Sequence, residues 1–399
     1  MIFNTYWFVV FCIVFFPVYW LLARPFGRRI WLLGGCVVFH SWFAGPAGVI
    51  PIFLLGLLTY GAALSRSRLA CSAMITLCAA ALLFYKYTHF ISIELLGWIN
   101  SPWADALRIS TEQLLPAAPP LAISFFVFEF VHYLVEVRRG EKPIKSPLSF
   151  ALFALHFPSL VAGPIKRYQS YVEELDHGVK SVTVDDVAAG IQRFAWGVVK
   201  KIVIADNLTL MLGYHESQFE VLSPFQSWLF LAGLSARILL DFSGYTDMAL
   251  GLSRMMGIKL PENFNWPYLA CNSRDFWQRW HMSLSSWIRD YIYIPLGGNR
   301  RGPLRRMLYA LFAFALCGLW HGPAWHFVLW GLWHGCGLLI SSSYPTLMGP
   351  LGRKLATVFQ AAPVLGWALT LLHVSFGWLL FFYDPSRAWN MALQLIGLT

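Results

Sequence analysis

The stretch CGLWHGPAWHFVLWGLWHG, residues 317–335, places three histidines inside a long apolar region. No acidic residue occurs between Asp290 and Asp384. Ionisable side chains at membrane depth are costly, and they usually face a polar interior or a substrate pathway. The stretch therefore predicts a membrane-embedded helical region in which at least one histidine has a function.

The composition excludes an ordinary soluble domain. Of 399 residues, 57% are hydrophobic and only 13% are charged, and the mean hydropathy is +0.56. Soluble domains carry roughly 25% charged residues, whereas several apolar runs here approach the roughly 20 residues that span a bilayer as a helix. A barrel would alternate apolar and polar positions, but these runs are continuous. We therefore predict an all-α polytopic integral membrane protein with roughly nine to eleven membrane-embedded segments.

The apolar runs and the basic clusters together predict a topology. In chain order, the candidate spans are residues 6–22, 30–43, 49–64, 69–85, 120–137, 226–240, 307–320, 325–341 and 364–382. The first is interpreted as a retained span, because it lacks the basic start and the cleavage site of a signal peptide. Basic clusters follow every second early span, which places them in the cytoplasm. Residues 146–201 have too little apolar sequence for full crossings, so we expect re-entrant or interfacial segments there.

Charge and cysteine content narrow the partners and cofactors. The net charge of +10 is accounted for by cytoplasmic loops, so a nucleic-acid partner is not expected. The seven cysteines form no CxxC pair, which argues against a disulfide framework or a thiolate metal site. We expect no metal and no resident cofactor. The alternative is a metal or haem site built from histidines, which the lack of nearby carboxylates disfavours.

Residues 275–293 interleave charges and aromatic rings at helical spacing. In a continuous helix the large apolar residues would share one face, and His281 and Ser285 would line its polar edge. The alternative is an interfacial amphipathic helix at the lipid headgroups. The glycine-rich basic loop that follows, residues 295–302, could hold a phosphorylated donor or could be a plain cytoplasmic loop.

The pair Gly322-Pro323 indicates where a helix begins, because proline is favoured at the first helical position. We predict a helix from Pro323 to about Ser341, with His321 just before its N-terminus. The positive end of the helix dipole disfavours an imidazolium and stabilises a developing oxyanion. A neutral imidazole there would suit a general base for acyl transfer. His326 and His334 lie on one face of the following helix, and we interpret both as structural.

Several blocks together resemble the membrane-bound O-acyltransferase (MBOAT) family. The resemblance is to its bacterial alginate O-acetylation branch, which is related to the D-alanyl transfer proteins of teichoic acid assembly. The matching blocks, in family order, are residues 123–126, 133–136, 158–167, 197–206, 241–247, 261–265, 275–301 and 318–335. The resemblance implies a helical bundle with a central tunnel. It also implies one membrane-embedded domain over residues 1–399, with N-terminal spans in 1–119, the MBOAT core in 120–341 and C-terminal spans in 342–399.

Carried over residue by residue, the resemblance implies that His321 is the catalytic histidine and that His281 is the second histidine of this branch. We expect His321 to act as general base or to carry the acyl group briefly. We expect His281 to polarise the acyl carbonyl or to orient the acceptor. The candidate substrate-binding residues are Asp241, Asn265, Arg279, Arg289, Trp320 and Trp325.

The resemblance implies an inner-membrane, multi-pass acetyltransferase in the O-acetylation of an exopolysaccharide such as alginate or cellulose. The donor is expected on the cytoplasmic side as acetyl-CoA. Besides the bilayer, the expected partners are a periplasmic acetyltransferase or a polysaccharide synthase complex, and transfer is direct or through such a partner. One alternative is transfer of another acyl group, for example D-alanine from a carrier protein to teichoic acid. Another is an acyl-group transporter without bond chemistry of its own.

Overall fold

Helices make up all of the regular secondary structure that is described. The computed structural model describes residues 3, 5–112, 115 and 119–398, and no β-strand occurs within those ranges. In lipid, a helix pairs every backbone N–H and C=O group within its own segment, which is why long apolar runs fold this way. The predicted all-α membrane class is confirmed.

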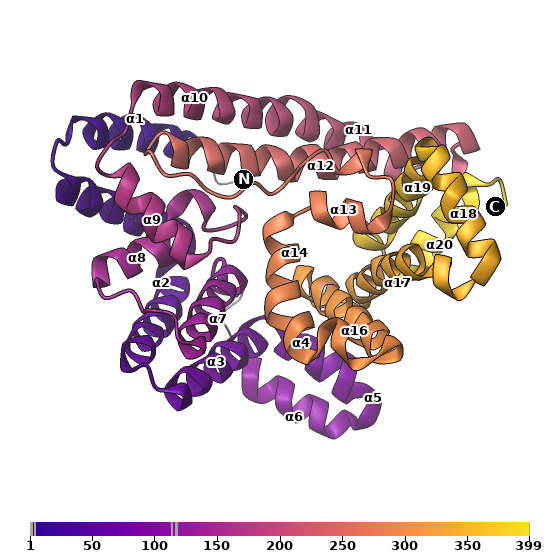
Figure 1. Ribbon diagram of the computed structural model, residues 1–399, viewed down its shortest axis with the longest axis horizontal. Coiled ribbons are helices and arrows are strands. Elements are labelled where there is room, and N and C mark those ends of the chain that lie inside the picture. Colours follow the sequence, from indigo (N-terminus) through magenta and orange to yellow (C-terminus); the bar gives the residue numbers. More distant parts are fainter. Residues whose placement is uncertain (1–2, 4, 113–114, 116–118, 399) are drawn as a thin grey trace. The chain divides into compact units, whose positions relative to one another are not determined.

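The chain divides into two compact units (Figure 1). The first comprises residues 1–198 and 245–261. Its helices are α1 (Tyr6–Leu21), α2 (Pro25–Ser65), α3 (Arg68–Leu82), α4 (Thr88–Phe90), α5 (Gly97–Ile99), α6 (Ser101–Glu112), α7 (Ile123–Arg139), α8 (Pro147–Leu155), α9 (Tyr168–Gly178), α10 (Val184–Val198) and the C-terminal part of α12 (Pro224–Arg254). Its core is rich in buried phenylalanine and tyrosine rings.

A close contact between two helices at glycine residues and a buried ion pair both contribute to the packing of the first unit. An added Cβ at Gly190 of α10 would lie 2.7 Å from the carbonyl oxygen of Gly251 of α12, so only glycine permits this approach. Glu129 and Lys166 form a buried ion pair at 2.5 Å. The Lys166 ammonium also donates to the Ser159 hydroxyl at 3.0 Å. A buried charge pair of this kind needs such additional hydrogen bonds to offset its desolvation.

The second unit comprises residues 199–244 and 262–399. Its helices are α11 (Asp206–Glu216), the N-terminal part of α12, α13 (Ser273–Arg279), α14 (Met282–Ile288), α15 (Ile294–Leu296), α16 (Pro303–His321), α17 (Trp325–Leu347), α18 (Gly349–Ala361), α19 (Pro363–Phe382) and α20 (Pro385–Leu395). In Figure 1, α16 and α17 run side by side as a hairpin, and α19 packs against α17. All the candidate catalytic and substrate-binding residues belong to this unit.

Three described segments are long and apolar enough to cross a membrane, namely Gly48–Ser65, Arg68–Ile99 and α19. The first is the second half of α2. The two spans predicted at residues 30–43 and 49–64 are merged in α2, but Gly45 interrupts it with a left-handed backbone, φ 62° and ψ 175°. The predicted break at Gly45 is therefore present, as a kink between two helical segments of α2.

Two predictions about local structure are wrong. The helix after His321 begins at Trp325, not at Pro323, because Ala324 is still extended at φ −153° and ψ 151°. The predicted continuous helix over residues 275–293 is broken at His281, whose backbone is left-handed at φ 42° and ψ 55°. There the chain pairs with residues 263–265 instead of continuing its helical ladder.

Candidate active site

The α16–α17 hairpin places His321 at its closed end. An added Cβ at Gly318 would lie 2.0 Å from the carbonyl oxygen of Phe327, and one at Gly331 would lie 2.1 Å from that of Phe314. Backbones that approach this closely need glycine on both helices. His321 is the last residue of α16, and Gly322 leaves the helix with an extended backbone. The dipole of α16 therefore presents its negative end at His321, which removes the helix N-terminus as an argument for a neutral imidazole there.

Aromatic rings surround the half-buried His321. Its ring centroid lies 4.7 Å from that of Trp320, 5.0 Å from Trp330 and 5.1 Å from Phe381. Trp330 and Phe381 contribute from α17 and α19 and meet the imidazole nearly edge to face. Such a ring cage fixes the plane of the imidazole and limits the access of water.

His281 lies at the break between α13 and α14 and is 1% exposed. Its Nδ1 lies 3.3 Å from the amide oxygen of Asn263. The ring of Phe242, from α12, packs edge-on against the imidazole at 4.7 Å. Backbone hydrogen bonds hold this arrangement, because Met282 N–H donates to the Asn263 carbonyl at 3.0 Å. His281 is therefore held by residues from three separate stretches of the chain.

Trp320 connects the two histidines. Its ring lies 6.0 Å from that of His281 and 4.7 Å from that of His321. The sequence predicted the two histidines as a pair about forty residues apart, and in the structure both rings contact the same indole. Trp320, a candidate substrate-binding residue, thus lies between them, while Trp325 begins α17 at the far side of the turn.

The other candidate binding residues are mostly tied into local contacts. Asp241 forms an ion pair with Lys201, which also pairs with Asp206. Arg279 donates to Asp275 at 2.7 Å, and its carbonyl accepts the backbone N–H of Asn265. These contacts position the elements around His281. They do not by themselves create a binding surface.

Asn263 is the buried polar residue that the sequence did not single out. It is 0% exposed, whereas the predicted Asn265, two residues later, is exposed. Both asparagines lie in the same block, Pro261–Asn265, so local spacing does not distinguish them. Only the pairing of this block with residues 279–282 selects Asn263 as the contact of His281.

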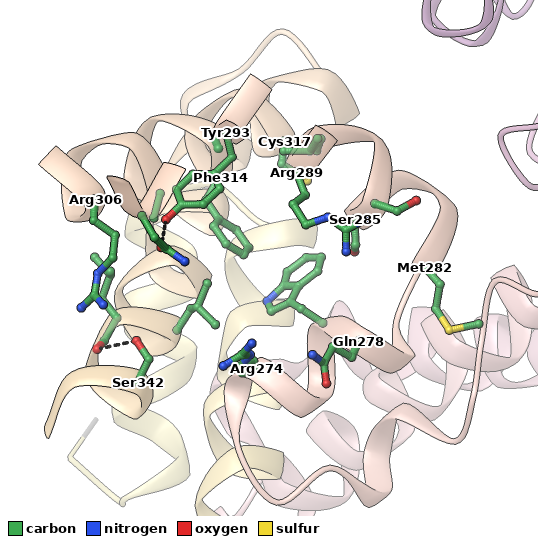
Figure 2. A pocket seen from close by; sticks show the side chains of 18 residues that line it. Arg274, Gln278, Met282, Ser285, Arg289, Tyr293, Arg306, Phe314, Cys317 and Ser342 are labelled. Atoms are coloured by element: carbon green, nitrogen blue, oxygen red, sulfur yellow. Dashed lines mark hydrogen bonds between the residues drawn. The ribbon is translucent and has the colours of Figure 1, made fainter. Parts of the chain in front are cut away.

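A cavity of about 580 Å³ is lined by residues of α13, α14, α16 and α17, and neither His281 nor His321 is among its described lining residues (Figure 2). Met282, next to His281, lines it, as does Cys317, one turn before His321. Figure 2 shows Arg274 and Gln278 together on α13 and Arg289 beside Ser285. The basic residues of its wall are Arg274, Arg289 and Arg306, and no acidic residue is among its described lining residues. Arginine forks bind phosphate oxygens well, so these arginines suit an anion, although Arg289 also pairs with Asp290 at 2.7 Å. The apolar lining residues suit a chain.

For the other two histidines of the opening stretch, His326 and His334, a structural role stays a prediction. His326 lies with its Nδ1 3.1 Å from the carbonyl oxygen of Leu380. His334 is fully buried, and its ring packs against Trp277 and Trp330 at 5.2 Å and 4.9 Å. In the described ranges, no group of three His, Cys, Asp or Glu side chains could hold a metal ion.

The sequence of the chain matches a family model and several named proteins. A model of the MBOAT family, the membrane-bound O-acyltransferases, matches residues 71–384. The protein named Probable alginate O-acetylase AlgI of Azotobacter vinelandii is 34% identical over 399 residues, covering 96% of this chain and 76% of that protein. The Peptidoglycan O-acetyltransferase of Helicobacter pylori is 32% identical, covering 75% and 59%. The Teichoic acid D-alanyltransferase of Bacillus subtilis is 35% identical, covering 51% and 54%.

Proposed function

The chain belongs to the membrane-bound O-acyltransferase family, and on that premise we propose that it transfers an acetyl group for the O-acetylation of an exopolysaccharide such as alginate or cellulose. The Azotobacter and Helicobacter relatives, whose names state O-acetyl transfer to polysaccharides, support the acyl group and the class of acceptor. The donor is acetyl-CoA on the cytoplasmic side of a bacterial inner membrane. The acetyl group passes to the polymer directly or through a periplasmic partner.

The observation that carries this proposal is that His281 and His321 both contact the ring of Trp320. Moving an acetyl group from a thioester to a hydroxyl requires a group that takes the hydroxyl proton as the ester bond forms. Two imidazoles around one indole supply that capacity, and the surrounding rings limit competing hydrolysis. We assign the transfer to this pair.

The neighbouring cavity suits the proposed donor. Acetyl-CoA combines phosphates with a flexible thioester arm, and the cavity combines three arginines with apolar residues such as Phe314 and Leu338. Its volume of about 580 Å³ lies within the range of ordinary small-molecule sites, roughly 300–1,000 Å³. In this proposal the arginines bind the phosphates, and the apolar lining residues contact the arm that carries the acyl group.

We place the protein in the inner membrane as a multi-pass protein, with a periplasmic acetyltransferase or a polysaccharide synthase complex as its partner. A soluble acetyltransferase in the periplasm has no acetyl-CoA of its own. A membrane protein that takes the group from the cytoplasm would supply it.

The test uses the full-length protein in proteoliposomes, with radiolabelled acetyl-CoA inside or outside and an alginate or cellulose oligosaccharide as acceptor. We expect label on the oligosaccharide, lost in His321→Ala and in His281→Ala. The matched control is His177→Ala, which replaces an exposed histidine of the first unit. Folded His321→Ala protein that transfers at the wild-type rate would refute the assignment of the pair.

A parallel arm replaces acetyl-CoA with a D-alanyl thioester of a carrier protein. Transfer from that donor alone would exclude the acetyl proposal in favour of the activity named for the Bacillus relative. Label that crosses the membrane without hydrolysis, with no ester formed and no effect of His321→Ala, would instead identify a transporter.

A further inference from the structure

The amide of Asn263 can have only one orientation. The atom that faces the backbone N–H of Ser283 at 3.1 Å must be an acceptor, because that N–H can only donate. This atom is therefore the amide oxygen and not the amide nitrogen. The same oxygen accepts the Ser283 hydroxyl hydrogen at 2.8 Å. Neighbouring donors thus settle an orientation that heavy-atom positions alone leave open.

The orientation of Asn263 determines where His281 has its hydrogen. The Nδ1 of His281 lies 3.3 Å from the same amide oxygen, so a hydrogen bond between them requires Nδ1 to donate. In a neutral imidazole only one ring nitrogen has a hydrogen. The Nε2 of His281 is then the acceptor, with its lone pair directed away from Asn263.

The neutral form is the one that this environment favours. His281 is 1% exposed, and burial of an imidazolium without a partner is costly. His281 lies outside the helices that are long and apolar enough to cross a membrane, and burial lowers its pKa. The titratable or charged residues nearest to it along the elements packed around it include Arg237 and Asp241 on α12, Glu262 beside Asn263, Arg274, Asp275 and Arg279 on α13, and His321 on α16. Of these, Asp241 is paired with Lys201, and Arg279 with Asp275.

The Nε2 atom is buried, and none of the described residues forms a hydrogen bond with it. A buried polar atom without a partner calls for an explanation, and among the described residues the two ring nitrogens of His334, within α17, share this property. The backbone of His281 is also constrained, since its φ is 42°, a region that non-glycine residues rarely occupy. The fold therefore fixes the position of the Nε2 acceptor, although this requires a strained backbone and leaves a buried nitrogen without a hydrogen bond to any described residue.

We propose that Asn263 is a positioning residue that fixes the Nδ1–H tautomer of His281, so that Nε2 takes the proton of the acceptor hydroxyl. The inference rests on the proposed function and divides the roles of the pair. As the hydroxyl oxygen forms its bond to the acyl carbon, the O–H bond breaks and the proton moves to Nε2. The bond between the acyl carbon and its leaving group, a thioester sulfur, breaks, and the sulfur leaves as a thiolate that recovers a proton from the imidazolium.

Of the two roles expected for His281, this assignment keeps the orientation of the acceptor, and it gives His281 the general-base role that was expected for His321. A neutral Nε2 with a lone pair cannot donate a hydrogen bond to the acyl carbonyl, so it orients the acceptor hydroxyl and removes its proton. His321, which is enclosed by aromatic rings at the end of α16, is then left to act on the acyl group. Asn263 acts only through His281 and touches no substrate.

Two substitutions at Asn263 separate positioning from simple packing. Asn263→Leu removes the acceptor, so the tautomer is no longer fixed, and we expect kcat to fall by at least about 100-fold with little change in the donor KM. Asn263→Asp keeps the acceptor and adds a negative charge, which stabilises the imidazolium. We expect it to retain transfer while the acid limb of kcat against pH moves to higher pH. The matched control is Asn207→Leu, at an exposed asparagine on α11.

The assay is acetyl transfer in proteoliposomes at saturating acetyl-CoA, with folding checked by monodisperse gel filtration. Wild-type kcat in folded Asn263→Leu, with His281→Ala inactive, would overturn the positioning role and leave the proposed function intact. Inactive but folded Asn263→Asp, or active Asn263→Asp without a shifted acid limb, would also overturn it. Wild-type rates in Asn263→Leu, His281→Ala and His321→Ala together would instead refute the proposed function. If Asn263→Leu does not fold, the pH profile of Asn263→Asp decides the question.

Discussion

Replacing Gly318 by alanine tests whether close packing of α16 and α17 sets the position of His321. The added Cβ would lie 2.0 Å from the carbonyl oxygen of Phe327, whereas real Cβ atoms essentially never approach within 3.0 Å. The obstacle is backbone, so it cannot rotate away, and the helices must separate by about 1 Å at this point. A displacement of about 1 Å at a reacting group costs on the order of 100-fold in rate. We therefore expect kcat for acetyl transfer to fall by about two orders of magnitude.

The same substitution should not weaken the helix, because alanine is favoured over glycine in a helix interior by about 1 kcal/mol. A loss of activity would therefore reflect the separation of the helices. The matched control is Gly213→Ala on α11, where nothing lies within 4 Å of the added Cβ. Both variants would be compared in proteoliposomes, with thermal unfolding in detergent as the measure of folding. Wild-type kcat in folded Gly318→Ala protein would refute the argument that this contact positions His321.

Three further predictions concern charge. Lys201→Met removes the positive charge between Asp206 and Asp241. Because both carboxylates are partly exposed, we expect the free energy of unfolding in detergent to fall by only roughly 1–2 kcal/mol. Adding Asp241→Asn should reduce this loss. Arg289→Ala should raise the KM for acetyl-CoA by about tenfold. The KM for acetyl-pantetheine should not change, because that donor lacks the nucleotide phosphates. An equal rise in both KM values would contradict phosphate binding by Arg289. Burial lowers the pKa of His281, so its neutral form persists on acidification. We therefore expect kcat to stay level from about pH 8 to about pH 6. A fall in kcat centred near about pH 6.5, the ordinary pKa of histidine, would contradict a buried base.

Most of the fold could be predicted because the bilayer leaves an apolar chain few choices. Continuous apolar runs must form helices in lipid, and so the spans predicted at residues 6–22 and 364–382 match α1 and α19 closely. Structural details that depend on packing could not be predicted from the sequence. The glycine at position 45 predicted a break between two helices, but whether the chain turns there or only kinks depends on what each half packs against.

The site was predictable in its residues and not in its geometry. The residues themselves singled out His321 beside Gly322-Pro323 and His281 in the polar aromatic segment, and the resemblance to a known family implied that both are catalytic. That both contact Trp320 depends on long-range packing, which spacing does not encode. Asn263 was missed because it lies two residues from Asn265 in the same block. What distinguishes the two is hydrogen bonding with residues twenty positions later, which no local pattern contains.

Both errors about local structure fall on the two histidines, and for one physical reason. Periodicity assumes a continuous helix, yet His281 interrupts one with a left-handed backbone and His321 ends another before an extended glycine. A side chain within a regular helix shares its direction with residues three and four positions away, whereas one at a break can be directed alone. Local rules are violated most often at functional sites, where strain and unsatisfied groups are retained. A helical backbone at position 281 should therefore make the protein more stable and abolish acetyl transfer. His281→Ala cannot test this, because it also removes the imidazole. The informative variant keeps His281 and weakens the pairing with residues 263–265, and we expect it to unfold at a higher temperature in detergent and to lose transfer.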